Sequence, residues 1–247
     1  MWEASKSIGY DIHAIDGTIG SLDDLLFDDT GWTIRWAVID TGTWLPGRRV
    51  LLPFAGLGRP QDRSFTVDAT REQVENAPGL DSDAPVSRQL ETEIHAHYSW
   101  PPYWDPNYSF PLGPTGIGGI VDPTPAVDVA RDAAPTGDPH LRSINEVTGY
   151  YVHANDGDIG HVEDFAIQED GSTIRYLMVD TRNWWPGKIV LIAPNWLTSI
   201  SWGESMVYID LSREQIRNSP EYDPSTGIRR QYEESLHGHY GYPPYWE

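Results

Sequence analysis

The sequence has no cysteine and only two lysines, and these absences exclude several classes of protein. Without cysteine the chain can form no disulfide, hold no iron–sulfur cluster through thiolates and use no thiol in catalysis or zinc binding. Basic residues of any kind are few, since 17 Lys and Arg stand against 37 Asp and Glu, a formal charge of −20 over 247 residues. Because such a surface repels phosphate, we expect no nucleic-acid partner and no attraction to anionic membranes.

Long apolar segments are missing as well. No run of about 18 apolar residues occurs, which is the length that a membrane-spanning helix requires. The first residues also lack the basic and apolar stretches of a signal peptide. We therefore expect a cytoplasmic protein with no membrane insertion.

The chain contains an internal repeat. Residues 8–50 align with 148–190 without gaps and share 19 of 43 positions, and residues 68–104 align with 210–246 and share 17 of 37. The offset rises from 140 in the first block to 142 in the second. Repeat 2 therefore has two extra residues between Val190 and Asp210, in the segment that contains Trp196 and Trp202.

The repeat predicts two domains, 1–104 and 144–247, joined by a linker over 105–143. Proline and glycine make up 12 of the 39 linker residues, a composition that favours an extended connection. A loop that packs across both domains is the alternative, because Tyr108, Phe110 and Ile117 are apolar enough to dock.

Each repeat combines short strands with two short helices. Five or six β-rich runs, separated by turns such as Asp16-Gly17, lie within about 60 residues, which predicts a small antiparallel barrel or sandwich. Capping-box patterns at Thr70-x-x-Gln73 and Ser212-x-x-Gln215 predict a helix after the strands. A second helix follows in each repeat, and its apolar residues at a spacing of four predict packing on the barrel or on the other repeat. Those residues are Val86, Leu90, Ile94 and Tyr98 in repeat 1, and Ile228, Tyr232, Leu236 and Tyr240 in repeat 2.

The order of these blocks resembles a known family. Repeat 1 contains Asp16-Gly17-x-Ile19-Gly20, then Ile34-Arg35-Trp36-x-Val38-Ile39-Asp40, Val50-Leu51-Leu52-Pro53 and Val67-Asp68-x-Thr70-Arg71-Glu72-Gln73. Repeat 2 contains the same blocks, and each repeat resembles a PRC-barrel domain. The resemblance implies two small antiparallel β-barrels with C-terminal helical extensions, in a mainly β fold. It also implies an adaptor fold that docks other proteins and has no catalytic residues.

The histidine and carboxylate clusters do not predict a metal site. His95-x-His97 and His237-x-His239 fall in the helical stretches, where residues two apart point in different directions. The acidic turns lack the complete loop of a calcium site. No nucleophile elbow or phosphate-binding loop occurs, so no catalytic residue, metal or cofactor is predicted.

Repeated aromatic residues are the candidate contacts for a partner. Trp and Tyr are enriched in the residues that dominate binding energies, and several stand at turns or at the ends of the repeats. These candidates are Trp44, Trp184, Trp185, Tyr103, Trp104, Tyr245 and Trp246. The alternative is structural, with the tryptophans closing the barrel ends and the Pro-Pro-Tyr-Trp tails holding each helix on its barrel.

Together these observations predict a non-enzymatic interaction or assembly module. We expect the repeats to pair as an intramolecular pseudo-dimer, related by a pseudo-two-fold axis. The partner is an unidentified protein or a second copy of the chain. The alternative is a small-ligand or metal-binding protein with its site between the repeats.

Overall fold

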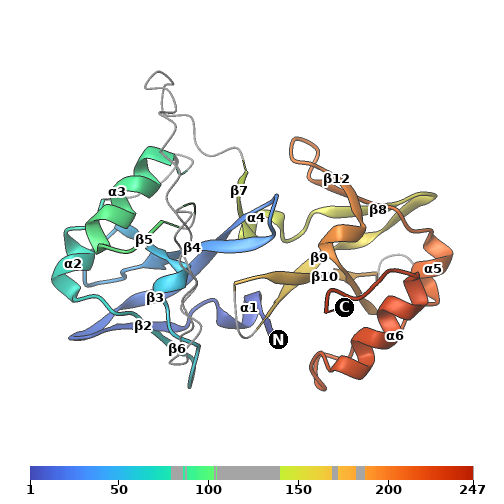
Figure 1. The fold of residues 1–247 in the computed structure, drawn as a ribbon, viewed down its shortest axis with the longest axis horizontal. Helices are drawn as coiled ribbons and strands as arrows, with labels where there is room; N and C mark the ends of the chain where they lie inside the picture. Colours follow the sequence, from blue (N-terminus) through green and yellow to red (C-terminus); the bar gives the residue numbers. More distant parts are fainter. Residues whose placement is uncertain are drawn as a thin grey trace, which may run out of the picture.

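The computed structural model describes residues 1–78, 86, 88–102, 104, 140–168, 172–181 and 187–246. The described chain forms two lobes side by side, one for each repeat (Figure 1). The lobe of repeat 1 contains a six-stranded sheet. Its strand order is β5 (Arg49–Pro53), β4 (Thr33–Asp40), β3 (Gly17–Asp28), β2 (Asp11–Ala14) and β6 (Ser64–Thr66), with β7 (Leu141–Ser143) also paired to β3.

The lobe of repeat 2 has a seven-stranded sheet with the corresponding order. Its strands are β11 (Ile189–Ile192), β10 (Ile174–Asp180), β9 (Gly157–Ile167), β8 (Tyr151–Ala154), β13 (Met206–Ile209) and β12 (Leu197–Ser201), with β1 (Trp2–Glu3) also paired to β9. The mainly β fold predicted from the sequence is confirmed.

The prediction of two small antiparallel β-barrels needs two corrections. Among the described strands, the end strands of each sheet do not pair with each other, so neither sheet closes. The pairs β2–β6 and β8–β13 are parallel. The chain leaves β2 through β3, β4 and β5, and then returns by way of the 3-10 turn Phe54–Gly56, so that β6 runs in the direction of β2. A tight antiparallel hairpin joins strands that follow each other directly in the chain, whereas β2 and β6 are separated by β3, β4 and β5.

Short helices complete each lobe as the sequence predicts. Both capping boxes form, at the starts of α2 (Arg71–Glu75) and α5 (Arg213–Arg217). The second helices are α3 (Arg88–Tyr98) and α6 (Arg230–Tyr240), and α3 packs against β5 of its own repeat. No helix in the described parts of the chain has the length and apolar character needed to cross a membrane.

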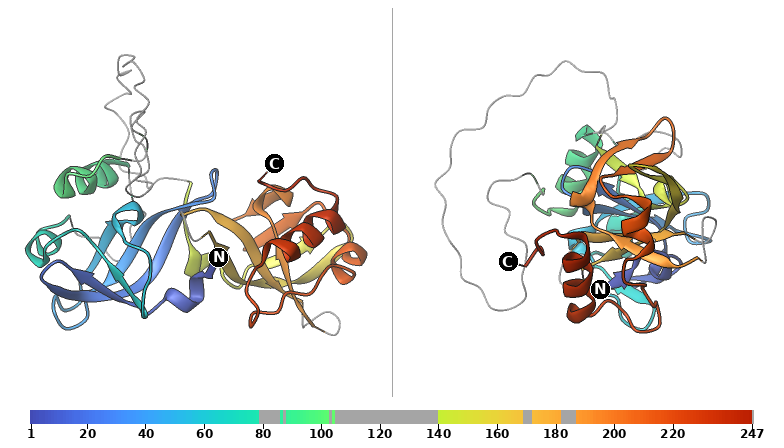
Figure 2. Two further views of the ribbon diagram at one scale, coloured as in Figure 1. Left: turned by 60° about the horizontal axis from the view of Figure 1, so that its bottom comes forward. Right: turned by 90° about the vertical axis from the view of Figure 1, so that its right-hand side faces the viewer.

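Each repeat lends its first strand to the sheet of the other. In β1, Glu3 pairs with Ala166 of repeat 2, and in β7, Ser143 pairs with Leu26 of repeat 1. These two registers correspond at the repeat offset of 140. The strands and the short helices that follow them, α1 (Ala4–Ser7) and α4 (Ile144–Val147), lie between the lobes (Figures 1 and 2). Leu141–Ser143, placed in the linker from the sequence, therefore belongs to a sheet.

Backbone hydrogen bonds at the centre of the junction are reciprocal too. The Ile34 amide donates to the Ser172 carbonyl and the Ile174 amide to the Trp32 carbonyl, both at 2.8 Å. Thr33 and Thr173 form a bridge between these two bonds. The repeats thus contact each other through equivalent residues, while a two-fold relation between the whole repeats stays a prediction.

Candidate interaction site at the junction of the repeats

A groove of about 350 Å³ opens where the β3–β4 turn of repeat 1 meets β12 of repeat 2. We call it the junction groove. The lining residues used below are Asp29, Trp32, Arg142, Leu197, Ile200 and Trp202. The groove therefore lies between the repeats, where the alternative prediction placed a ligand site.

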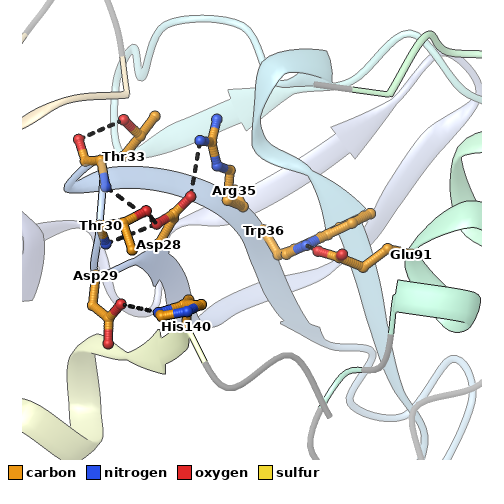
Figure 3. A network of polar contacts seen from close by, with 9 residues as sticks. Asp28, Asp29, Thr30, Thr33, Arg35, Trp36, Glu91 and His140 are labelled. Atoms are coloured by element: carbon orange, nitrogen blue, oxygen red, sulfur yellow. Dashed lines mark hydrogen bonds and ion pairs between the residues drawn. The ribbon is translucent and has the colours of Figure 1, made fainter. Parts of the chain in front are cut away.

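The β3–β4 turn on the repeat 1 side is held by one carboxylate. Asp28 accepts hydrogen bonds from the amides of Thr30 and Gly31, at 2.8 and 3.1 Å, and from the Arg35 guanidinium at 3.1 Å (Figure 3). Burial would raise the pKa of Asp28, but a hydrogen bond from the Thr30 hydroxyl, together with those from the two amides and Arg35, outweighs it and lowers the pKa to about 2. Asp28 is therefore ionised at neutral pH and fixes the shape of the turn.

Trp32 follows this turn in a strained backbone conformation. Its φ of 50° lies in the left-handed region, which bulky side chains rarely adopt. The half-buried ring stacks on Phe27 with 5.3 Å between centroids. The equivalent residue of repeat 2 is Ser172. Strain of this kind, which costs about 1–3 kcal/mol, clusters at binding sites, so it points to a role for the Trp32 ring beyond packing.

Arg142 connects the two sides of the groove. Its Nε lies 3.2 Å from Oδ2 of Asp29, and its guanidinium lies 3.9 Å from the centre of the Trp202 ring. The other oxygen of Asp29 contacts Nδ1 of His140 at 2.9 Å (Figure 3). A guanidinium held between a carboxylate and an indole fixes both, so the Trp202 ring is oriented before any partner arrives.

Strand β12 presents an edge to the same groove. It ends the sheet of repeat 2 and pairs with β13, and its other edge meets no described strand. The corresponding segment of repeat 1 contains Gly58 and Pro60, and proline has no N–H to offer a new strand. Repeat 2 has Thr198 and Ile200 instead, and its edge is a strand of five residues whose pairing with β13 is irregular between Leu197 and Ser199 and continuous from Ser199 to Ser201.

The described aromatic residues that were predicted as partner contacts lie outside this groove. Trp44 is half-buried beneath the Arg71 guanidinium, which lies 4.7 Å from the ring centre. Trp104 contacts His95, and Trp246 contacts His237 and the Arg230 guanidinium. None of these three lines the junction groove. Tyr103, Trp184 and Trp185 lie outside the described residues.

Buried polar contacts join each helical extension to its sheet. In repeat 2, Glu233 accepts hydrogen bonds from Tyr176 at 3.1 Å and from Tyr245 of the tail at 2.9 Å. In repeat 1, buried Glu91 accepts one from the Trp36 indole at 2.7 Å (Figure 3). Tyr245 thus helps to hold α6, as the structural alternative predicts, although 37% of its surface stays exposed.

The histidine pairs separate as the helical spacing predicts. His237 Nε2 lies 3.0 Å from the Tyr176 hydroxyl, and burial lowers the pKa of His237. His239 faces the Gln215 carbonyl at 2.7 Å, and His97 faces the Gln73 carbonyl at 2.6 Å. The partners of His237 and His239 differ, so the two rings are not arranged to share one metal.

Comparison with models of known protein families identifies the family of each repeat. The PRC-barrel domain model matches residues 3–74 and 139–216, which together make up more than half of the chain. The chain belongs to the PRC-barrel family. The two matched segments confirm that it is a tandem PRC-barrel protein, and they begin next to the exchanged strands β1 and β7. A search of curated proteins found no match.

The sequence interpretation missed the residues that build the groove. Two signals for them were present: Trp32 stands where repeat 2 has Ser172, and the two extra residues of repeat 2 fall in the segment of β12 and Trp202. Arg142 gave no signal of its own, because it was assigned to the linker.

Proposed function

We propose that this tandem PRC-barrel protein is a non-enzymatic assembly module whose junction groove binds an extended segment of another protein. The observation that carries the proposal is the edge of β12 that meets no other described strand, beside two oriented tryptophans, Trp32 and Trp202. An exposed strand edge is a template for a further strand, which pairs through its backbone and inserts alternate side chains into neighbouring pockets. Two PRC-barrel domains suggest a non-catalytic module, which agrees with this role.

Charge defines the chemistry of the partner segment further. With a net charge of −20, the chain repels acidic segments and attracts basic ones. Leu197, Ile200 and the two tryptophans give the groove apolar contacts beside its polar residues. The segment that fits best is therefore extended, with apolar side chains on one face and basic residues at its ends.

Selection from a random peptide library on the full-length chain tests the proposal. Selected peptides are then measured against Ile200→Pro, which places proline on the β12 edge as Pro60 stands in repeat 1, and against Trp202→Ala. The control is Ile15→Ala, an apolar residue 67% exposed in a hairpin turn that does not line the groove.

We expect each groove variant to weaken binding about tenfold or more, as loss of a central contact does. Hydrogen exchange should also show that the peptide protects the amides of β12. Peptides that bind Ile200→Pro and Trp202→Ala as well as they bind the native chain would disprove the proposal, as would an equal loss in Ile15→Ala.

A further inference from the structure

Three metal-ligating side chains meet on the sheet of repeat 2, away from the junction groove. His161 and Glu163 come from β9 and Asp180 from β10. One ligand atom from each lies within 4.8 Å of the other two, and His161 Nε2 is 3.5 Å from Oε2 of Glu163. Imidazole nitrogen and carboxylate oxygen are both ligands of divalent transition metals.

The strand pairing explains why these side chains converge. His161 lies directly opposite Asp180 in the antiparallel β9–β10 ladder, so the two side chains share one face. The register then shifts, because Val179 pairs with Val162 and Met178 with Asp164, which leaves Glu163 as the extra residue of a bulge. Val162 is buried, His161 is half-buried and Glu163 is exposed, so both flanking ligands lie on the side away from the core.

Repeat 1 has the same backbone and a different balance of charge. Its equivalent positions are Ser21, Asp23 and Asp40, which offer no imidazole. Arg49 of β5 lies opposite Asp40 of β4 and forms an ion pair with Asp23 at 3.2 Å.

At the position of Arg49, repeat 2 has Ile189, a residue of β11 that lies opposite Asp180 of β10. The cation that faces the carboxylates of repeat 1 is thus replaced by an aliphatic side chain, while an imidazole is gained. The imidazole adds a ligand for a metal ion, and Ile189 brings no charge to the position that Arg49 occupies in repeat 1.

We infer that His161, Glu163 and Asp180 bind one divalent transition-metal ion of the zinc class. Three protein ligands leave one position of a tetrahedral ion open to water. The imidazole disfavours Ca²⁺ and Mg²⁺, which take oxygen ligands in larger number. The site is independent of the proposed peptide groove, so either can fail without the other.

Cobalt is the probe, because Co²⁺ occupies zinc sites and its visible absorption reports coordination. Co²⁺ is titrated into the untagged full-length chain, and Zn²⁺ is then added as competitor. The test variants are His161→Ala and Glu163→Gln, and the second changes an exposed side chain that folding tolerates. The control is His153→Ala, which removes another histidine–carboxylate pair of the same repeat, with Asp158 at 2.6 Å.

We expect one Co²⁺ per chain, displaced by Zn²⁺ and not by Mg²⁺, with affinity at least tenfold lower in both test variants. His153→Ala should bind as the native chain does. Absence of saturable Co²⁺ binding would overturn the inference, and so would binding that His161→Ala and Glu163→Gln leave unchanged.

Discussion

The exchange of first strands predicts unequal costs for two similar substitutions, Ser5→Ala and Ser143→Ala. The Ser5 hydroxyl and amide donate to the two oxygens of Asp164 in repeat 2, at 2.5 and 2.9 Å. The Ser143 hydroxyl donates to Asp24 in repeat 1 and also accepts from the Glu146 amide at 2.9 Å, which caps α4. Ser5 has one contact to lose through its hydroxyl, whereas Ser143 has two.

The structure sets the size of each effect. Loss of a hydrogen bond to a charged group costs about 1.5–3 kcal/mol, so we expect Ser5→Ala to lower the free energy of unfolding by about 2 kcal/mol. Ser143→Ala also removes a helix cap worth about 1 kcal/mol, which brings its cost to about 3 kcal/mol. For a chain of this size the melting temperature should fall by about 2–4 °C per kcal/mol.

The cost of each substitution should depend on pH, because both acceptors are carboxylates shielded from solvent: Asp164 is buried and Asp24 is half-buried. Burial raises the pKa of Asp24 and of Asp164, and the serine hydrogen bonds oppose that rise. A carboxyl whose pKa is raised in the folded state adds stability at low pH and loses it as the pH rises through the folded pKa. Removal of the serine raises the folded pKa further, so the cost of Ser5→Ala should shrink between pH 7 and about pH 5.

Urea denaturation at the two pH values measures these differences. Ser225→Ala is the matched control, because its hydroxyl also donates to an aspartate, Asp223 at 2.7 Å, but on the exposed surface. We expect the control to cost less than about 0.5 kcal/mol. The reasoning is refuted if Ser5→Ala costs no more than the control, or as much as Ser143→Ala.

Two further predictions concern the junction. Trp32→Gly should be about 1 kcal/mol more stable than Trp32→Ala, because both remove the ring and only alanine has a Cβ strained at a φ of 50°; thermal melts compare them, and equal stability would contradict the strain at Trp32. Repeat 2 expressed alone, as residues 140–247, should form a homodimer in which each copy receives the β7 strand of the other in place of β1; light scattering after size exclusion gives its mass, and a stable monomer would count against exchange as the source of pairing.

The parts of the fold that could be predicted from the sequence are those that depend on patterns within a few neighbouring residues. The capping boxes at Thr70 and Ser212 formed as predicted, because their hydrogen bonds lie within four residues. The apolar stripes of the second helices left their partner open, and the contacts of Glu91 and Glu233 place both helices on their own sheets. Local periodicity defines the buried face of a helix, but not the element that covers it.

The exchanged strands and the groove depend on contacts that no local pattern records. β1 and β7 contain two and three residues, too few for an alternation of apolar and polar side chains. Their partners, on β9 and β3, are more than 100 residues away in the chain. The groove unites Trp32, Arg142 and Trp202 by the same long-range pairing, and the positive φ of Trp32 is a property of the folded backbone alone.

The two repeats together indicate how many partner segments one chain can hold. A second cavity, of about 300 Å³, lies beside the other exchanged strand and is lined by Trp2, Tyr10, Pro60 and Tyr222. It differs from the junction groove in the backbone that could pair with an added strand. Pro60 stands at the position of Ile200 and offers no N–H to such a strand. Contacts that both repeats retain, such as the reciprocal backbone hydrogen bonds, hold the lobes together. Trp32 and Ile200 have no counterpart of the same kind in the other repeat, so they occur at the junction groove and not at the second cavity. The proposed function therefore requires one bound segment per chain, although the fold contains two copies of the same domain.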